Sequence, residues 1–144
     1  MRYLLAYVGC ALVMAGLDAV WLTVVGPHLY PPAIGELLAP RPDMAPAVVF
    51  YVIYVAGVVG LAVAPALERR SARRAAALGA ALGFVAYATY DLTNQATLRV
   101  WPVHLTLIDL TWGASLTAAA ALGGYALARR VAPGAGAGAG AGRT

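Results

Sequence analysis

Four long apolar runs, separated by short polar segments, divide the chain into residues 3–25, 46–67, 75–97 and 105–128. A membrane core of about 30 Å takes about 20 helical residues to cross, and each run is long enough to do so. The pattern therefore predicts an all-α polytopic membrane protein folded as a bundle of four transmembrane helices. A signal peptide is the alternative for the first run, but its apolar region would be only about 7 to 15 residues long.

The residues between the apolar runs predict where the helices begin and end. Gly26 and Pro27 predict the end of the first helix, and the longest connector then runs to Met44. Pro46 predicts the start of the second helix, because the first turn of a helix tolerates a residue without an N–H group. We expect one transmembrane domain over residues 1–131.

Small residues mark two further features. Gly79 and Gly83 form a small-xxx-small pair in the third run, which predicts close contact with a neighbouring helix. Residues 132–144 are rich in Gly and Ala and predict a disordered tail.

Composition agrees with a membrane protein whose main partner is the lipid bilayer. Only 11% of the residues are charged and 62% are hydrophobic, whereas about a quarter of a soluble domain is charged. The formal charge of +4 does not predict nucleic-acid binding, because the arginines lie in short clusters between the apolar runs. Cys10 is the single cysteine, so no internal disulfide is possible.

The arginines predict the orientation of the four helices. If both termini face the cytoplasm, Arg41 and Arg99 are the only arginines on the opposite side. The cytoplasmic set is then Arg2, Arg69, Arg70, Arg73, Arg74, Arg129, Arg130 and Arg143. Since cytoplasmic loops carry an excess of Lys and Arg, the distribution predicts cytoplasmic N- and C-termini.

The stretch from Tyr87 to Gln95 places a carboxyl group and two amides near the end of the third run. At 1.5 Å of rise per residue, Asp18, Asp91 and Asp109 all fall roughly 8 to 11 Å below the outer surface. Each ionised Asp costs about 2.5 to 3.5 kcal/mol at mid-membrane, so we expect the three to face one another rather than lipid. Protons, a bound cation or hydrogen bonds must then balance their charge.

Helical spacing adds large neighbours to these acids. Asp18 and Trp21 lie at i and i+3, and Asp109 and Trp112 repeat that spacing on an antiparallel helix. The predicted ligand-binding set is Asp18, Trp21, Tyr51, Tyr54, Tyr87, Tyr90, Asp91, Asn94, Asp109 and Trp112. The alternative is a purely structural role, in which the acids only join the helices by hydrogen bonds. Each such bond contributes about 0.6 kcal/mol to stability.

No established catalytic or cofactor motif accompanies the acids. The sequence contains no Walker loop, dinucleotide fingerprint, Ser-His-Asp pattern or paired-cysteine motif, and no cofactor is identified. Asp and Asn suit a hard cation, but without a compact ligand motif we predict no metal site.

The run Tyr87–Leu98, followed by Trp101-Pro102 and then by Asp109 with Trp112-Gly113, resembles the signature of a family of small bacterial four-span membrane proteins. Leu17-Asp18 with Trp21-Leu22, and Phe50-Tyr51 with Ile53-Tyr54, resemble its pattern in the first two runs. That family is catalogued as a domain of unknown function. The resemblance implies four helices in a bacterial inner membrane, with no activity, substrate or cofactor to carry over.

We therefore expect an outward-facing intramembrane pocket of carboxyl, Tyr and Asn groups that binds a small or lipidic molecule. One alternative is an intramembrane acid-base enzyme of the isomerase or cyclase type, with Asp18, Asp91 and Asp109 as the candidate catalytic residues. A second is a proton- or cation-coupled carrier, which would be a homo-oligomer because four short spans enclose little volume. A structural or assembly protein without a pocket is a third.

Overall fold

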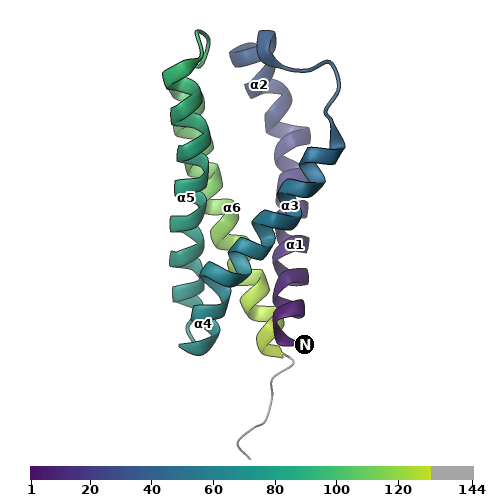
Figure 1. The fold of residues 1–144 in the computed structure, drawn as a ribbon, viewed down its shortest axis with the longest axis vertical. Helices are drawn as coiled ribbons and strands as arrows, with labels where there is room; N and C mark the ends of the chain where they lie inside the picture. Colours follow the sequence, from purple (N-terminus) through teal and green to yellow (C-terminus); the bar gives the residue numbers. More distant parts are fainter. Residues whose placement is uncertain (131–144) are drawn as a thin grey trace, which may run out of the picture.

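A computed structural model describes residues 1–130, and these residues fold as four long helices without a strand. Each helix is long and apolar enough to cross a membrane. The predicted all-α bundle of four candidate spans is therefore confirmed (Figure 1). The elements are α1 (Arg2–Val20), η1 (Trp21–Val25), α2 (Gly26–Ile34), η2 (Gly35–Leu37), α3 (Met44–Val58), η3 (Val59–Val63), α4 (Ala64–Glu68), α5 (Ala72–Thr97) and α6 (Val103–Arg130). The predicted tail, residues 132–144, lies outside the described residues.

The first helix does not end at Gly26 and Pro27, so that prediction is wrong. The π-helical turn η1 joins α1 directly to α2, with the Gly26 N–H bonded to the Trp21 carbonyl five residues back. Pro27 then falls in the first turn of α2, where its missing N–H group is tolerated. The second span has the same arrangement of a π-helical turn followed by a proline: η3 precedes Pro65, which lies in the first turn of α4.

Two of the predicted boundaries move because capping side chains set them. Asp43 caps α3 by accepting a hydrogen bond from the Ala45 N–H at 3.0 Å, so the second span begins at Met44 rather than Pro46. Ser71 accepts from the Arg74 N–H at 3.2 Å and starts α5 inside the basic turn. With α2 and η2 helical, the non-helical part of the first connector shrinks to residues 38–43.

Helix α6 is the centre of the bundle, and α1 and α5 pack against it (Figure 1). Half of its most apolar 18-residue stretch (50%) is buried, against 22% to 28% in the other three spans. Glycines allow the close approach: a Cβ at Gly79 or Gly83 would collide with backbone of α6, which confirms the predicted contact of that pair. Gly124 of α6 faces Cys10 and the Ala6 carbonyl of α1 in the same way.

Helix α3 runs obliquely across the bundle rather than along it. Figure 1 shows it descending from the side of α1 to the lower end of α5, where α4 ends. Its N-terminal half keeps large apolar side chains exposed, among them Val48, Val49 and Phe50. In the membrane these side chains contact lipid.

Candidate functional site

Asp18 of α1 is a buried acid that joins three helices. The Tyr51 hydroxyl of α3 donates to its Oδ2 at 2.6 Å, and the Trp112 indole N–H of α6 donates to its Oδ1 at 3.4 Å. Both donors belong to the predicted ligand-binding set, but the tryptophan that bonds to Asp18 is Trp112 and not Trp21, its neighbour at i+3. Both of its oxygens thus accept hydrogen bonds from other helices, so the burial of Asp18 is explained without a ligand.

Asp109 of α6 is reached from the first span by a second chain of hydrogen bonds. The Trp21 indole N–H donates to the Tyr30 hydroxyl at 2.9 Å, and that hydroxyl donates to Asp109 Oδ1 at 3.0 Å. The Trp21 and Trp112 rings stack with centroids 4.1 Å apart. The two Asp-x-x-Trp motifs are thus joined by their tryptophans, and each acid is linked to the tryptophan of the other helix.

Tyr30 was missed by the sequence analysis, which placed it in a connector. It became a site residue because the helix continues through Pro27, and α2 then carries Tyr30 to Asp109. The signal that predicts this is a proline at the first turn of a new helix. Thr117, which shares a hydrogen bond of 2.8 Å with the Tyr54 hydroxyl, was missed because a threonine in an apolar helix has no distinguishing pattern.

Asp91 of α5 differs from the other two acids. Its exposed fraction is 0%, yet neither carboxyl oxygen has a hydrogen-bond partner among residues 1–130. Native proteins pair the large majority of buried polar side-chain atoms, so an unpartnered carboxyl group calls for an explanation. It is therefore the least explained polar group of the site.

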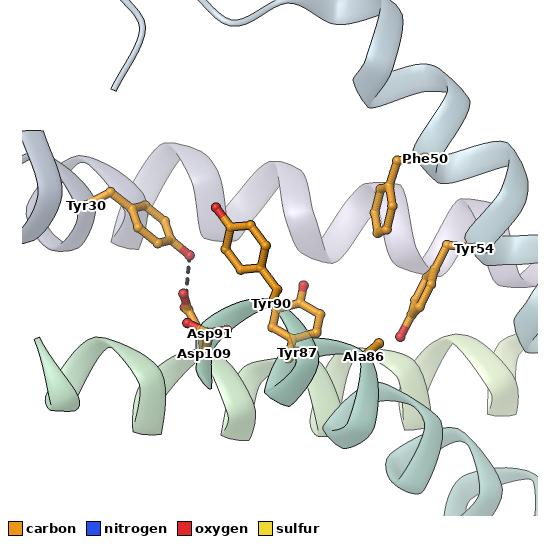
Figure 2. Close-up of a pocket in the computed structure, with 8 residues that line it drawn as sticks. All are labelled: Tyr30, Phe50, Tyr54, Ala86, Tyr87, Tyr90, Asp91 and Asp109. Atoms are coloured by element: carbon orange, nitrogen blue, oxygen red, sulfur yellow. Dashed lines mark hydrogen bonds between the residues drawn. The ribbon is translucent and has the colours of Figure 1, made fainter. Parts of the chain in front are cut away.

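Asp91 and Asp109 line one cavity of about 410 Å³ between the helices (Figure 2). Five of its eight lining residues are aromatic, and the full set is Tyr30, Phe50, Tyr54, Ala86, Tyr87, Tyr90, Asp91 and Asp109. Figure 2 shows the carboxyl groups at one end of the cavity, below Tyr30, with Phe50 and Tyr54 at the other end. The cavity is thus an apolar, aromatic chamber with acid groups at one end.

The structure divides the predicted ligand-binding set into three groups. Tyr54, Tyr87, Tyr90, Asp91 and Asp109 line the cavity, whereas Asp18, Trp21, Tyr51 and Trp112 form the adjoining hydrogen-bonded and stacked network. Asn94 is half-buried and lies outside the cavity lining. Phe50 and Ala86 line the cavity although the sequence analysis did not select them.

Other polar groups near the C-terminal end of α5 hold the helices rather than line the cavity. Gln95 accepts a hydrogen bond from the Thr106 hydroxyl of α6 at 2.8 Å, and Thr106 in turn accepts one from the Trp101 indole at 3.2 Å. Thr93 bonds back to carbonyls of its own helix. These groups are satisfied locally, whereas Asp91 is the fully buried polar group of this stretch without a hydrogen-bond partner within residues 1–130.

The acids have neutral partners. Tyr and Trp side chains make the hydrogen bonds to Asp18 and Asp109, and none of the cavity-lining residues is basic. Within residues 1–130, no group of three or more His, Cys, Asp or Glu side chains is placed to hold a metal ion. Any positive charge near Asp91 and Asp109 must therefore come from protons or from a bound molecule.

The Asp18 network allows a direct test of its structural role. Replacing Tyr51 by Phe removes the 2.6 Å hydrogen bond and leaves one buried Asp18 oxygen unpartnered, so we expect a loss of about 1 to 3 kcal/mol in stability. Thermal unfolding in detergent, followed by circular dichroism, measures the change. Tyr7→Phe is the control, since it removes an exposed 3.2 Å bond to the Val52 carbonyl and should have a smaller effect. Equal losses in the two variants would contradict this role for Asp18.

Comparison with known proteins identifies a family for this chain but no individual relative. No curated protein and no solved structure matches the chain significantly. A family model described as "Predicted membrane protein (DUF2177)" matches residues 3–126, a segment that contains all four candidate spans except Arg2 and the last four residues of α6. The chain therefore belongs to DUF2177, a family of predicted membrane proteins of unknown function.

Proposed function

We propose that this protein binds a small or lipidic molecule in the cavity lined by Asp91 and Asp109. The observation that carries the proposal is the Asp91 carboxyl group, which is fully buried, unpartnered within residues 1–130 and part of the cavity wall. A buried polar group without a partner destabilises a fold, typically by about 1 to 3 kcal/mol. A ligand that bonds to Asp91 removes that penalty.

The shape and lining of the cavity support the same function. Its volume of about 410 Å³ lies within the range of about 300 to 1,000 Å³ typical of small-molecule sites. Such sites combine mostly apolar and aromatic walls with a few polar groups that orient the ligand. Here the aromatic rings supply the walls, and the two acids supply the polar groups.

The ligand is expected to enter from the side of the bundle. Phe50 of α3 and Tyr90 of α5 both line the cavity, and they are also 50% and 60% exposed. A cavity whose wall residues also reach the lipid-facing surface is accessible to molecules dissolved in the bilayer. The arginine distribution supports an opening in the extracytoplasmic half of the membrane.

Filling the cavity tests the proposal. Lipid and metabolite mass spectrometry of the purified protein should detect a co-purifying molecule, and Ala86→Trp should lose it because the indole occupies the chamber. Val85→Trp is the matched control, since Val85 is the preceding residue on α5, is 60% exposed and does not line the cavity.

The outcomes separate binding from adventitious lipid. A molecule retained by Val85→Trp and lost from Ala86→Trp supports a site in the cavity. If the wild-type protein and both tryptophan variants carry the same bulk lipids in the same proportions, the proposed binding function is wrong.

A further inference from the structure

We infer that the ligand of this cavity carries a protonated primary or secondary amine, which Asp91 and Asp109 receive through charge-assisted hydrogen bonds. This inference rests on the proposed binding function and names the chemical class of the molecule. It is built from the charges of the lining, the aromatic walls and the unpartnered Asp91 oxygens.

The charge of the cavity selects a cation. Its two ionisable acids, Asp91 and Asp109, lie among neutral side chains, and Asp109 receives its hydrogen bond from the Tyr30 hydroxyl. A ligand with a carboxylate or phosphate group would add negative charge to a site without a basic residue in its lining. A cationic group instead balances the acids in a place where water is largely excluded.

The aromatic lining favours an organic cation over a metal ion. Four tyrosines and one phenylalanine surround the space beside the acids. The face of an aromatic ring attracts a nearby ammonium group by about 0.5 to 2 kcal/mol, depending on how far the pair is desolvated. A hard metal ion needs about six oxygen ligands, and residues 1–130 do not assemble three acidic or histidine ligands in one place.

The unpartnered oxygens select an amine over a quaternary ammonium group. Both Asp91 oxygens can accept hydrogen bonds, and neither receives one within residues 1–130. A protonated primary or secondary amine has N–H groups to donate, whereas a quaternary ammonium has none. The amine therefore satisfies the hydrogen-bonding capacity of Asp91 as well as its charge.

The rest of the ligand is expected to be apolar. Away from the acids the chamber is walled by Phe50, Ala86 and the ring of Tyr54, and it reaches the lipid-facing surface at Phe50. An alkyl chain or a hydrophobic ring system fits these walls and partitions into the bilayer. A lipophilic amine combines both requirements.

Three probes with the same alkyl chain test the class of polar group. Binding of dodecylammonium, dodecyltrimethylammonium and dodecanol is measured at pH 7 in nanodiscs of zwitterionic lipid, with empty nanodiscs subtracted. A simple amine is protonated at this pH, since its pKa is about 10. We expect the wild-type protein to bind dodecylammonium at least about tenfold more tightly than either other probe.

Two variants assign the selectivity to Asp91. Asp91→Asn keeps the size of the side chain and removes its charge, so the preference for dodecylammonium should fall to within about twofold of dodecanol. Glu36→Gln is the control, because it removes one negative charge from the exposed segment η2 outside the cavity. It should leave the preference unchanged. Dodecanol binding that persists in Asp91→Asn shows that the cavity is intact.

The outcomes distinguish this inference from the function on which it rests. If wild-type protein binds the three probes equally, or binds dodecyltrimethylammonium best, the inference of an amine ligand is wrong. The proposal that the cavity binds a molecule is then retained. If no probe binds but a molecule still co-purifies and is lost from Ala86→Trp, the inference of an amine ligand is again wrong and the binding function is supported. If no probe binds and nothing specific co-purifies, both proposals fail.

Discussion

Replacing Asp91 by leucine is expected to stabilise the purified, ligand-free protein by about 1 to 3 kcal/mol. The wild-type carboxyl group is fully buried, and its oxygens lack partners within residues 1–130. Leucine removes that desolvation penalty and leaves Asp109 as the single acid of the cavity. The same substitution should abolish binding of an amine, so stability and binding change in opposite directions.

Asp18→Leu is the matched control for this experiment. Both acids are buried in the bundle, but Asp18 accepts hydrogen bonds from Tyr51 and Trp112. Its removal leaves two partly buried donors without their acceptor, so we expect destabilisation of about 2 kcal/mol. Unfolding in detergent measures both variants. A stability loss in Asp91→Leu as large as that in Asp18→Leu would show that Asp91 holds the helices together.

Gly83→Leu is expected to destabilise the bundle by about 3 kcal/mol or more. A Cβ at this position would collide with the Gly113 carbonyl and lie 2.6 Å from the Thr117 hydroxyl oxygen, so α5 must move away from α6. Backbone atoms cannot change rotamer to make room, which makes this contact costlier than a clash with a flexible side chain. Because Tyr87 and Asp91 follow on α5, the displacement should also disrupt the cavity.

Gly16→Leu provides the comparison for Gly83→Leu. Gly16 is exposed on α1, and a Cβ there meets no atom within 4 Å. Helix propensity changes equally in the two variants, so their difference reports packing. Equal unfolding midpoints would rule out the α5–α6 contact described above.

The acids were the part of the site that sequence reasoning could locate. Asp18, Asp91 and Asp109 stand out because ionisable residues are expensive in apolar spans, and helical rise converts their positions into a common depth. The structure brings them into one region, where Trp21 and Trp112 stack and join the networks of Asp18 and Asp109. Their role in binding a ligand stays a prediction.

The residues that sequence reasoning missed depend on the path of the backbone. Tyr30 reaches Asp109 because the π-helical turn η1 carries the first helix past Pro27. Phe50 and Ala86 line the cavity because α3 crosses the bundle obliquely and α5 approaches α6 through glycines. Neither a π-helical turn nor a crossing angle has a clear signature in one sequence, because both result from how neighbouring helices pack.

Apolar run length was sufficient to determine the four helices, because the bilayer imposes a length, and the charged residues predict a common depth for the acids, because the bilayer excludes ions. Tertiary structure alone decided which acids are satisfied within the protein. Asp18 and Asp91 are equivalent in sequence terms, as each is one acid in an apolar helix. They differ because the donors Tyr51 and Trp112 come from other helices and reach only Asp18, whereas Asp91 lines the cavity and receives no hydrogen bond within residues 1–130.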